Sequence, residues 1–117
     1  MPGNLLSHTF EYHVKCFEII KHSELAKKDE WLLFVATKCY VEIFILRKPN
    51  NFYELEKTGL KVNVCVDEIF IFKNRVFIHN TQSKRLEELI ISYTSNSWVY
   101  KVLVGTDSLS DHYQIKR

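Results

Sequence analysis

Short apolar runs, rich in β-branched and aromatic residues, recur along this chain and are separated by short polar stretches. Trp31–Thr37 is almost continuously apolar, as expected of a strand that is covered on both faces. Cys39–Leu46, Leu60–Val66 and Ser97–Val104 instead show the two-residue period of a strand. Runs this short and of this composition predict an all-β chain, or a mostly β chain with one short helix.

One hairpin is predicted in detail. Glu68–Phe72 and Arg75–Asn80 flank Lys73–Asn74, which has the length of a two-residue hairpin loop. A loop of that length fixes the register, and apolar pairs then face each other at each step. The expected pairs are Ile71 with Val76, Phe70 with Phe77, and Ile69 with Ile78.

Two segments fit a helix and a strand alike. Phe10–Ile20 has an apolar stripe at helical spacing and also the alternation of a strand. Ser83–Tyr93 shows both patterns as well, with Ser83 as a candidate helix N-cap. Periodicity alone does not decide either case.

The order of elements repeats within what we expect to be a single β-rich domain, residues 1–117. Units at about 31–66 and 68–104 each contain two apolar runs, a polar turn and two further runs. A partial earlier copy lies in the segment TFEYHVKCFEII. This repeat favours strands for both undecided segments.

The segments LLFVATKCYVEIFIL and RVFIHNTQSKRLEELI resemble the middle strands of β-propeller blades, as in degenerate WD-repeat proteins. The resemblance implies about two antiparallel blades and a role as a protein-binding scaffold. Where a WD repeat carries Trp-Asp, this chain has Phe44–Ile45 and His79–Asn80, and no Gly-His pair precedes either unit. Because a ring normally takes about 4–8 blades, the expectation is a fragment of a larger propeller, or a chain that pairs through open sheet edges with a protein or itself.

Composition and charge narrow the function classes. A hydrophobic content of 46% supports a buried core, so disorder is excluded. The net charge is only +2 and the basic residues are scattered, which disfavours nucleic-acid binding. The three cysteines form no Cys-x-x-Cys pair, and neither a signal peptide nor a membrane span is evident, so we expect an intracellular protein with at most peripheral membrane contact.

No motif for catalysis or cofactor binding is present, so the sequence predicts a non-enzyme without cofactors. The best metal constellation is His13, Cys16 and His22, of which the first two would share a face only on a helix. No fourth ligand lies near them, so core or surface roles are favoured over zinc.

Paired carboxylates occur at Glu54/Glu56, Asp67/Glu68 and Glu87/Glu88. Acid–base catalysis would need two of them to converge in a pocket, whereas a solvated strand edge or a turn explains them as well. Trp31 and Trp98 begin equivalent strands, and core packing is favoured over a role in partner binding. The same holds for the phenylalanines of the hairpin, Phe70, Phe72 and Phe77.

Two functions compete. The first is a non-catalytic protein-interaction module built from propeller-like blades. The alternative is a compact α+β barrel similar to a pleckstrin-homology domain, which would bind a phosphoinositide or a peptide. There the Lys73–Arg75 hairpin tip, with Lys27 and Lys28, would contact phosphate. That barrel requires a helix at Ser83–Tyr93.

Overall fold

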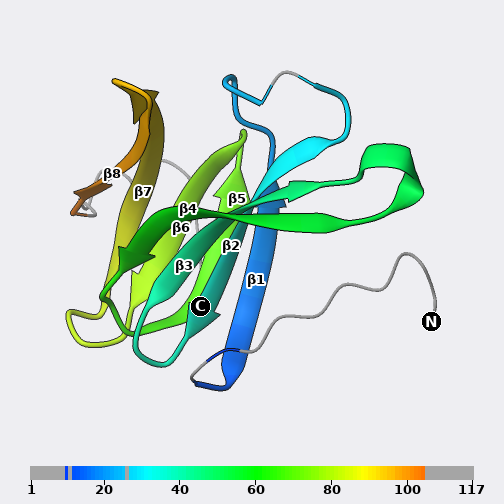
Figure 1. Cartoon of the computed structure of the whole chain (residues 1–117). Helices are drawn as coiled ribbons and strands as arrows, with labels where there is room; N and C mark the ends of the chain where they lie inside the picture. The colour runs from blue at the N-terminus through cyan, green and yellow to red at the C-terminus, as the bar shows by residue number, and fades with distance from the viewer. Residues whose placement is uncertain (1–9, 11, 26, 105–117) are drawn as a thin grey trace.

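The computed structural model describes residues 10, 12–25 and 27–104, and they form two four-stranded antiparallel sheets (Figure 1). Sheet A consists of β1 (Val14–Ile20), β2 (Glu30–Thr37), β3 (Val41–Arg47) and β4 (Glu54–Val62), with a short 3₁₀ turn at Pro49–Asn51. Sheet B consists of β5 (Val66–Phe72), β6 (Arg75–Asn80), β7 (Arg85–Thr94) and β8 (Ser97–Leu103). The predicted all-β class, with two antiparallel four-stranded units, is confirmed.

Both undecided segments are strands. The first, 10–20, contains β1, and the second, 83–93, contains most of β7. β7 pairs with β6 on one side and with β8 on the other, so its backbone groups are used in the sheet. The described part of the chain contains no α-helix, and the α+β barrel therefore lacks the helix that it requires.

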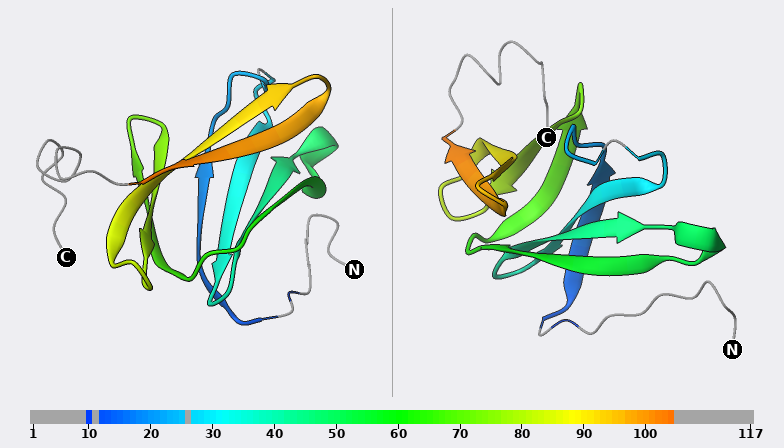
Figure 2. Two further views of the ribbon diagram at one scale, coloured as in Figure 1. Left: turned by 90° about the vertical axis from the view of Figure 1, so that its left-hand side faces the viewer. Right: turned by 45° about the horizontal axis from the view of Figure 1, so that its top comes forward.

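The β5–β6 hairpin forms in the predicted register, with Phe70 opposite Phe77 and Ile71 opposite Val76. Its loop residues Lys73 and Asn74 have φ angles of 50° and 59°. Two successive positive φ angles are typical of a type I′ turn, whose twist matches that of the flanking strands. The β7–β8 loop at Ser95–Asn96 has the same pattern, with φ angles of 50° and 62°, and Figure 2 shows the two strands as a long, twisted hairpin.

The predicted strand Leu60–Val66 is wrong in its bounds. Leu60 lies near the end of β4, residues 63–65 are the connection, and Val66 begins β5. Gly59, at φ 87°, forms a β-bulge, where Thr58 Oγ1 donates a hydrogen bond to the Ile43 carbonyl at 2.6 Å. One bulged strand thus replaces the two strands expected between 54 and 66. The sheets divide the chain at 63–65, and sheet A includes β1, which precedes the expected unit 31–66.

The inner faces of the two sheets enclose one hydrophobic core (Figures 1 and 2). Its fully buried side chains include Phe34 and Ile43 from sheet A and Ile78 from sheet B. β1 lies along β5, and β4 lies along β8, so the sheets meet near both pairs of edges. Burial of this shared core is what holds the two sheets together.

The outer faces also bury aromatic side chains. Phe44, on the outer face of sheet A, is fully buried, and the Phe10 ring packs edge-on against it at 5.8 Å between centroids. Phe77, on the outer face of sheet B, is fully buried as well, and the Arg75 guanidinium lies 5.3 Å from its ring centre. Each sheet therefore has apolar residues on both faces, unlike a sheet with one solvated face.

Candidate functional site

The three candidate metal ligands do not converge. His13 is exposed and precedes β1, Cys16 is half-buried within β1, and His22 follows the strand. The Cys16 thiol lies 4.0 Å from the Asp67 carbonyl of β5, and burial is the main cause that raises its pKa from the usual thiol value. Within the described ranges, no three histidine, cysteine or carboxylate side chains are grouped as metal ligands.

His22 instead links the two sheets. Its Nδ1 accepts a hydrogen bond from the Glu24 backbone N–H at 3.0 Å, so Nδ1 carries no proton. Nε2 therefore carries the ring proton and donates it to the Ile91 carbonyl of β7 at 2.7 Å. The ring also packs edge-on against Trp98, with 5.2 Å between centroids. Both nitrogens are used, so the imidazole holds its segment onto sheet B rather than serving a metal.

One of the three predicted carboxylate pairs, Glu87/Glu88, is engaged in structural contacts. Glu87 and Glu88 are both buried in β7, which the sequence did not indicate. Arg75 binds Glu88 with two hydrogen bonds, of 2.8 and 2.7 Å, and the Asn80 amide donates to Glu87 at 3.4 Å. Because neighbouring strand residues point to opposite faces, these two carboxylates do not converge in one pocket.

The other two acidic pairs lie on β5 and β4, and Glu54 and Glu56 share one face of β4. Asp67 and Glu68 lie within β5, at a bulge and not in a turn as predicted, and Asp67 accepts a hydrogen bond from His79 Nδ1 at 2.9 Å. Glu56 is paired with Arg47, whereas its neighbour Glu54 is exposed on the edge strand β4.

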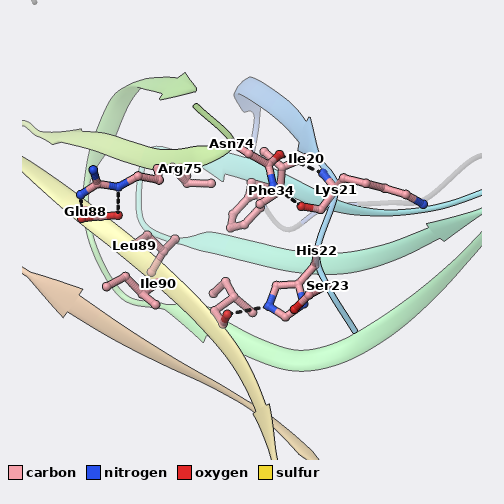
Figure 3. Close-up of a pocket in the computed structure, with 12 residues that line it drawn as sticks. Ile20, Lys21, His22, Ser23, Phe34, Asn74, Arg75, Glu88, Leu89 and Ile90 are labelled. Atoms are coloured by element: carbon pink, nitrogen blue, oxygen red, sulfur yellow. Dashed lines mark hydrogen bonds and ion pairs between the residues drawn. The ribbon is translucent and has the colours of Figure 1, made fainter. Parts of the chain in front are cut away.

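Two cavities open between the sheets on the side of His22. The first, of about 280 Å³, lies between the end of β1 and strands β6 and β7. Figure 3 shows His22 bonded to the β7 backbone at one side of this cavity, and Asn74 bonded to Lys21 at another. Phe34, Leu89 and Ile91 supply apolar lining. These contacts hold the end of β1 across sheet B.

The second cavity, of about 250 Å³, is lined by residues from both sheets and is called the aromatic–acid pocket below. Its lining residues are Glu24, Leu25, Glu30, Ile45, Arg47, Glu56, Tyr93 and Trp98. Sheet B contributes the two aromatic rings, and sheet A contributes Glu30, Arg47 and Glu56. This pocket was not predicted, because its residues come from five strands and the segment after β1, which are far apart in the sequence.

An exposed apolar surface runs along β1 on the outer face of sheet A. Phe17 is 60% exposed and Ile19 is 42% exposed, and they lie opposite Val35 and Leu33 of β2. Leu33 is half-buried, whereas Val35 is buried. Phe17, Ile19 and Leu33 are called the β1 apolar face below. Exposed aromatic and branched side chains gathered on one sheet face are typical of interaction surfaces.

The two tryptophans have different surroundings. Trp98 is half-buried and packs against the core and against Tyr93, with 5.0 Å between ring centroids. Trp31 is half-buried on the outer face of sheet A, where the Lys21 ammonium lies 5.4 Å from its ring centre. The predicted core role thus describes Trp98 better than Trp31.

The basic residues proposed for phosphate binding come together in part. The Lys21 backbone N–H donates to the Asn74 side chain at 3.3 Å, which places the β5–β6 turn beside the segment that follows β1. The Lys21 ammonium donates to the Lys27 and Lys28 carbonyls, so that loop lies at the same end of the molecule. Lys27, Lys28 and Lys73 are exposed there, whereas Arg75 is paired with Glu88.

Comparison with protein families, curated proteins and solved structures finds no match to this chain. The part of the chain that the structure describes has no helix of the length and apolarity needed to cross a bilayer. The function proposed below therefore rests on the surfaces of this molecule alone.

Proposed function

We propose that this chain is a non-catalytic protein-interaction module that docks a protein partner on the β1 apolar face. The observation that carries the proposal is the exposure of Phe17 and Ile19, at 60% and 42%, on a sheet whose inner face is already buried in the core. Full burial of one apolar side chain of this size stabilises by about 1.5–3 kcal/mol relative to exposure. A partner that covers Phe17 and Ile19 would gain this free energy on binding. The proposal that the chain is non-catalytic is supported by the three carboxylate pairs, because most of these acidic side chains make contacts within the fold.

The charges around this face indicate the chemistry of the partner. Lys15 lies on β1, is exposed and shares the face of Phe17, because the two residues are two positions apart on a strand. Lys38 is exposed beyond β2, with its ammonium 5.6 Å from the Tyr12 ring centre. The two lysines lie toward the Val14–Thr37 end of this face and fit carboxylates of the partner there, whereas Glu42, on the same face opposite Val35, fits a basic group.

Replacing Phe17 with aspartate in the full chain is expected to weaken partner binding by about tenfold or more, because the aromatic anchor that the partner would cover is replaced by an uncompensated charge. The measurement compares proteins retained by immobilised wild type and variant, followed by affinity determination for the retained protein. Val99→Asp is the matched control, because Val99 is a similarly exposed apolar residue on β8 of sheet B.

We expect Phe17→Asp to lose the partner and Val99→Asp to retain it. Circular dichroism checks that both variants are folded. Retention that is equal in all three proteins would contradict the proposal. Sedimentation of wild type and Phe17→Asp identifies the partner class: a concentration-dependent dimer that only the wild type forms indicates a second copy of this chain.

The resemblance to degenerate propeller blades belongs to the same proposal. It is supported by two sheets of four antiparallel strands, each joined in chain order, as in a blade. We also propose a reducing, intracellular setting, which is supported by Cys16, Cys39 and Cys65 being free thiols.

A second candidate is binding of a phosphate-bearing lipid surface at the end of the molecule where Lys27, Lys28 and Lys73 are exposed. The specific observation is the hydrogen bonding of Lys21 to Asn74 and to the Lys27–Lys28 carbonyls, which brings these loops together. Arg75 does not belong to this group, because its guanidinium is neutralised by Glu88.

The double variant Lys27→Glu/Lys28→Glu is expected to bind vesicles containing phosphatidylinositol phosphate at least about tenfold more weakly, since each basic residue near an anionic surface contributes about 1 kcal/mol. Cosedimentation with these vesicles, and with phosphatidylcholine vesicles alone, measures the effect. Lys101→Glu/Lys61→Glu is the control, because both lysines are exposed on strands of the two sheets. Equal losses in both double variants, or binding that ignores the lipid charge, would exclude this candidate.

A further inference from the structure

The aromatic–acid pocket has one aromatic wall. Tyr93 and Trp98 lie opposite each other in the β7–β8 pairing, and their rings are tilted by 58° with 5.0 Å between centroids. Two tilted rings offer an approaching group two π faces or edges at once. The ring of His22 also packs edge-on against Trp98.

The wall contributed by sheet A is charged. Arg47 donates from Nε to Glu30 at 2.7 Å and from Nη1 to Glu56, so one guanidinium serves two carboxylates. These hydrogen bonds, with Glu30 first and Glu56 second, raise the pKa of Arg47 from its usual value. Glu24 lines the same pocket, so three carboxylates face a single guanidinium and the pocket carries excess negative charge.

The remaining lining is apolar. Leu25 and Ile45 are both buried core residues that also border the pocket. The pocket therefore combines a hydrocarbon surface, two aromatic rings and unbalanced carboxylates within about 250 Å³. These are the three features that recognise an ammonium group on an alkyl chain: methylenes pack on hydrocarbon, while the cation is attracted by rings and carboxylates.

We propose that the aromatic–acid pocket binds an alkylammonium group, either a lysine side chain of another protein or a small free organic ammonium ion. This inference concerns a different surface from the β1 apolar face and does not depend on the proposed function. An anionic ligand would be repelled by the surplus of carboxylates. Arg47 does not offset this repulsion, because its guanidinium is already paired with Glu30 and Glu56.

The proposal is tested by titrating the full chain with n-butylammonium chloride at constant ionic strength, followed by the indole N–H resonances in NMR spectra. The chain has two tryptophans, and a Trp31→Phe variant assigns the Trp98 signal. We expect a saturable shift of the Trp98 signal and a much smaller shift for Trp31, which lies on the outer face of sheet A. n-Butanol supplies the same hydrocarbon without the charge and is expected to shift Trp98 at least about threefold less at equal concentration.

Glu56→Gln is the informative variant, because the Glu56 side chain is 55% exposed and its removal does not disturb the core. It is expected to weaken butylammonium binding by about threefold to tenfold, as for one solvent-accessible ionic contact. Glu42→Gln makes the same change of charge on the opposite face of sheet A and is expected to leave the affinity unchanged. Tyr93→Leu removes one ring while keeping an apolar side chain, and it is expected to weaken binding as well.

Three results would overturn the proposal: no saturable shift of Trp98, an equal response to n-butanol, or equal affinities of Glu56→Gln and Glu42→Gln. The source of the ligand is distinguished by comparing choline with a short lysine peptide and its Nε-acetylated form. Tighter binding of the lysine peptide, lost on acetylation, identifies a protein side chain, whereas tighter binding of choline identifies a small free cation.

Discussion

Replacement of Phe34 with alanine is expected to lower the free energy of unfolding by about 3–5 kcal/mol, which is a large part of the stability of a domain of this size. Phe34 is fully buried on the inner face of β2, within the core shared by both sheets. It also borders the cavity of about 280 Å³ beside His22. Its loss enlarges that space, and the facing strands can collapse only in part.

Urea denaturation, followed by tryptophan fluorescence and circular dichroism, measures this effect. Phe17→Ala is the matched control, because the same side-chain atoms are removed from a position that is 60% exposed. We expect the control to cost about 1 kcal/mol or less. Similar losses for Phe34 and Phe17 would contradict both the shared core and the exposed β1 apolar face.

The second large effect is expected at Phe77, on the other side of sheet B. Phe77→Ala should also lower the free energy of unfolding by about 3–5 kcal/mol, although Phe77 lies outside the core shared by the two sheets. Its burial depends on the β5–β6 hairpin, where Phe70 pairs with it, and on the Arg75 guanidinium that lies over its ring. Phe77→Leu, which keeps most of the volume, should cost less.

The contribution of Arg75 is separated by a double-mutant cycle with Arg75→Ala. Because Arg75 contacts both Phe77 and Glu88, its removal should cost less in the Phe77→Ala background than in the wild type. Strictly additive losses would mean that the guanidinium does not help to cover the ring. Equilibrium unfolding of the four proteins in urea gives the coupling energy.

The β5–β6 hairpin could be predicted from local sequence patterns, whereas the bulged strand β4 could not. The β5–β6 register follows from a two-residue loop and apolar pairs, which are both local, and it was predicted residue by residue. β4 was divided wrongly, because Thr58–Gly59 resembles the end of a strand. The Thr58 hydroxyl bonds across to β3, and a bulge of this kind depends on the neighbouring strand, which a local pattern does not contain.

The candidate sites also differ in whether they depend on local sequence or on the packing of the two sheets. Lys27, Lys28 and the Lys73–Arg75 tip were grouped as phosphate contacts of a barrel; the structure brings Lys27, Lys28 and Lys73 to one end of the molecule, whereas Arg75 is paired with Glu88. The aromatic–acid pocket was missed, since Glu30, Arg47 and Trp98 meet only when sheet A packs on sheet B. His22 was considered as a metal ligand, yet its partners are a backbone N–H two residues away and a carbonyl on β7.

The connection at residues 63–65 has a consequence for how the chain folds. Every paired strand in either sheet is adjacent in sequence to its partner, and those three residues are the covalent link between the two sheets. Each sheet can thus grow hairpin by hairpin with short loops to close, which is rapid for β structure. Docking of one sheet onto the other is the step that demands long-range contacts, and we expect it to limit the rate of folding.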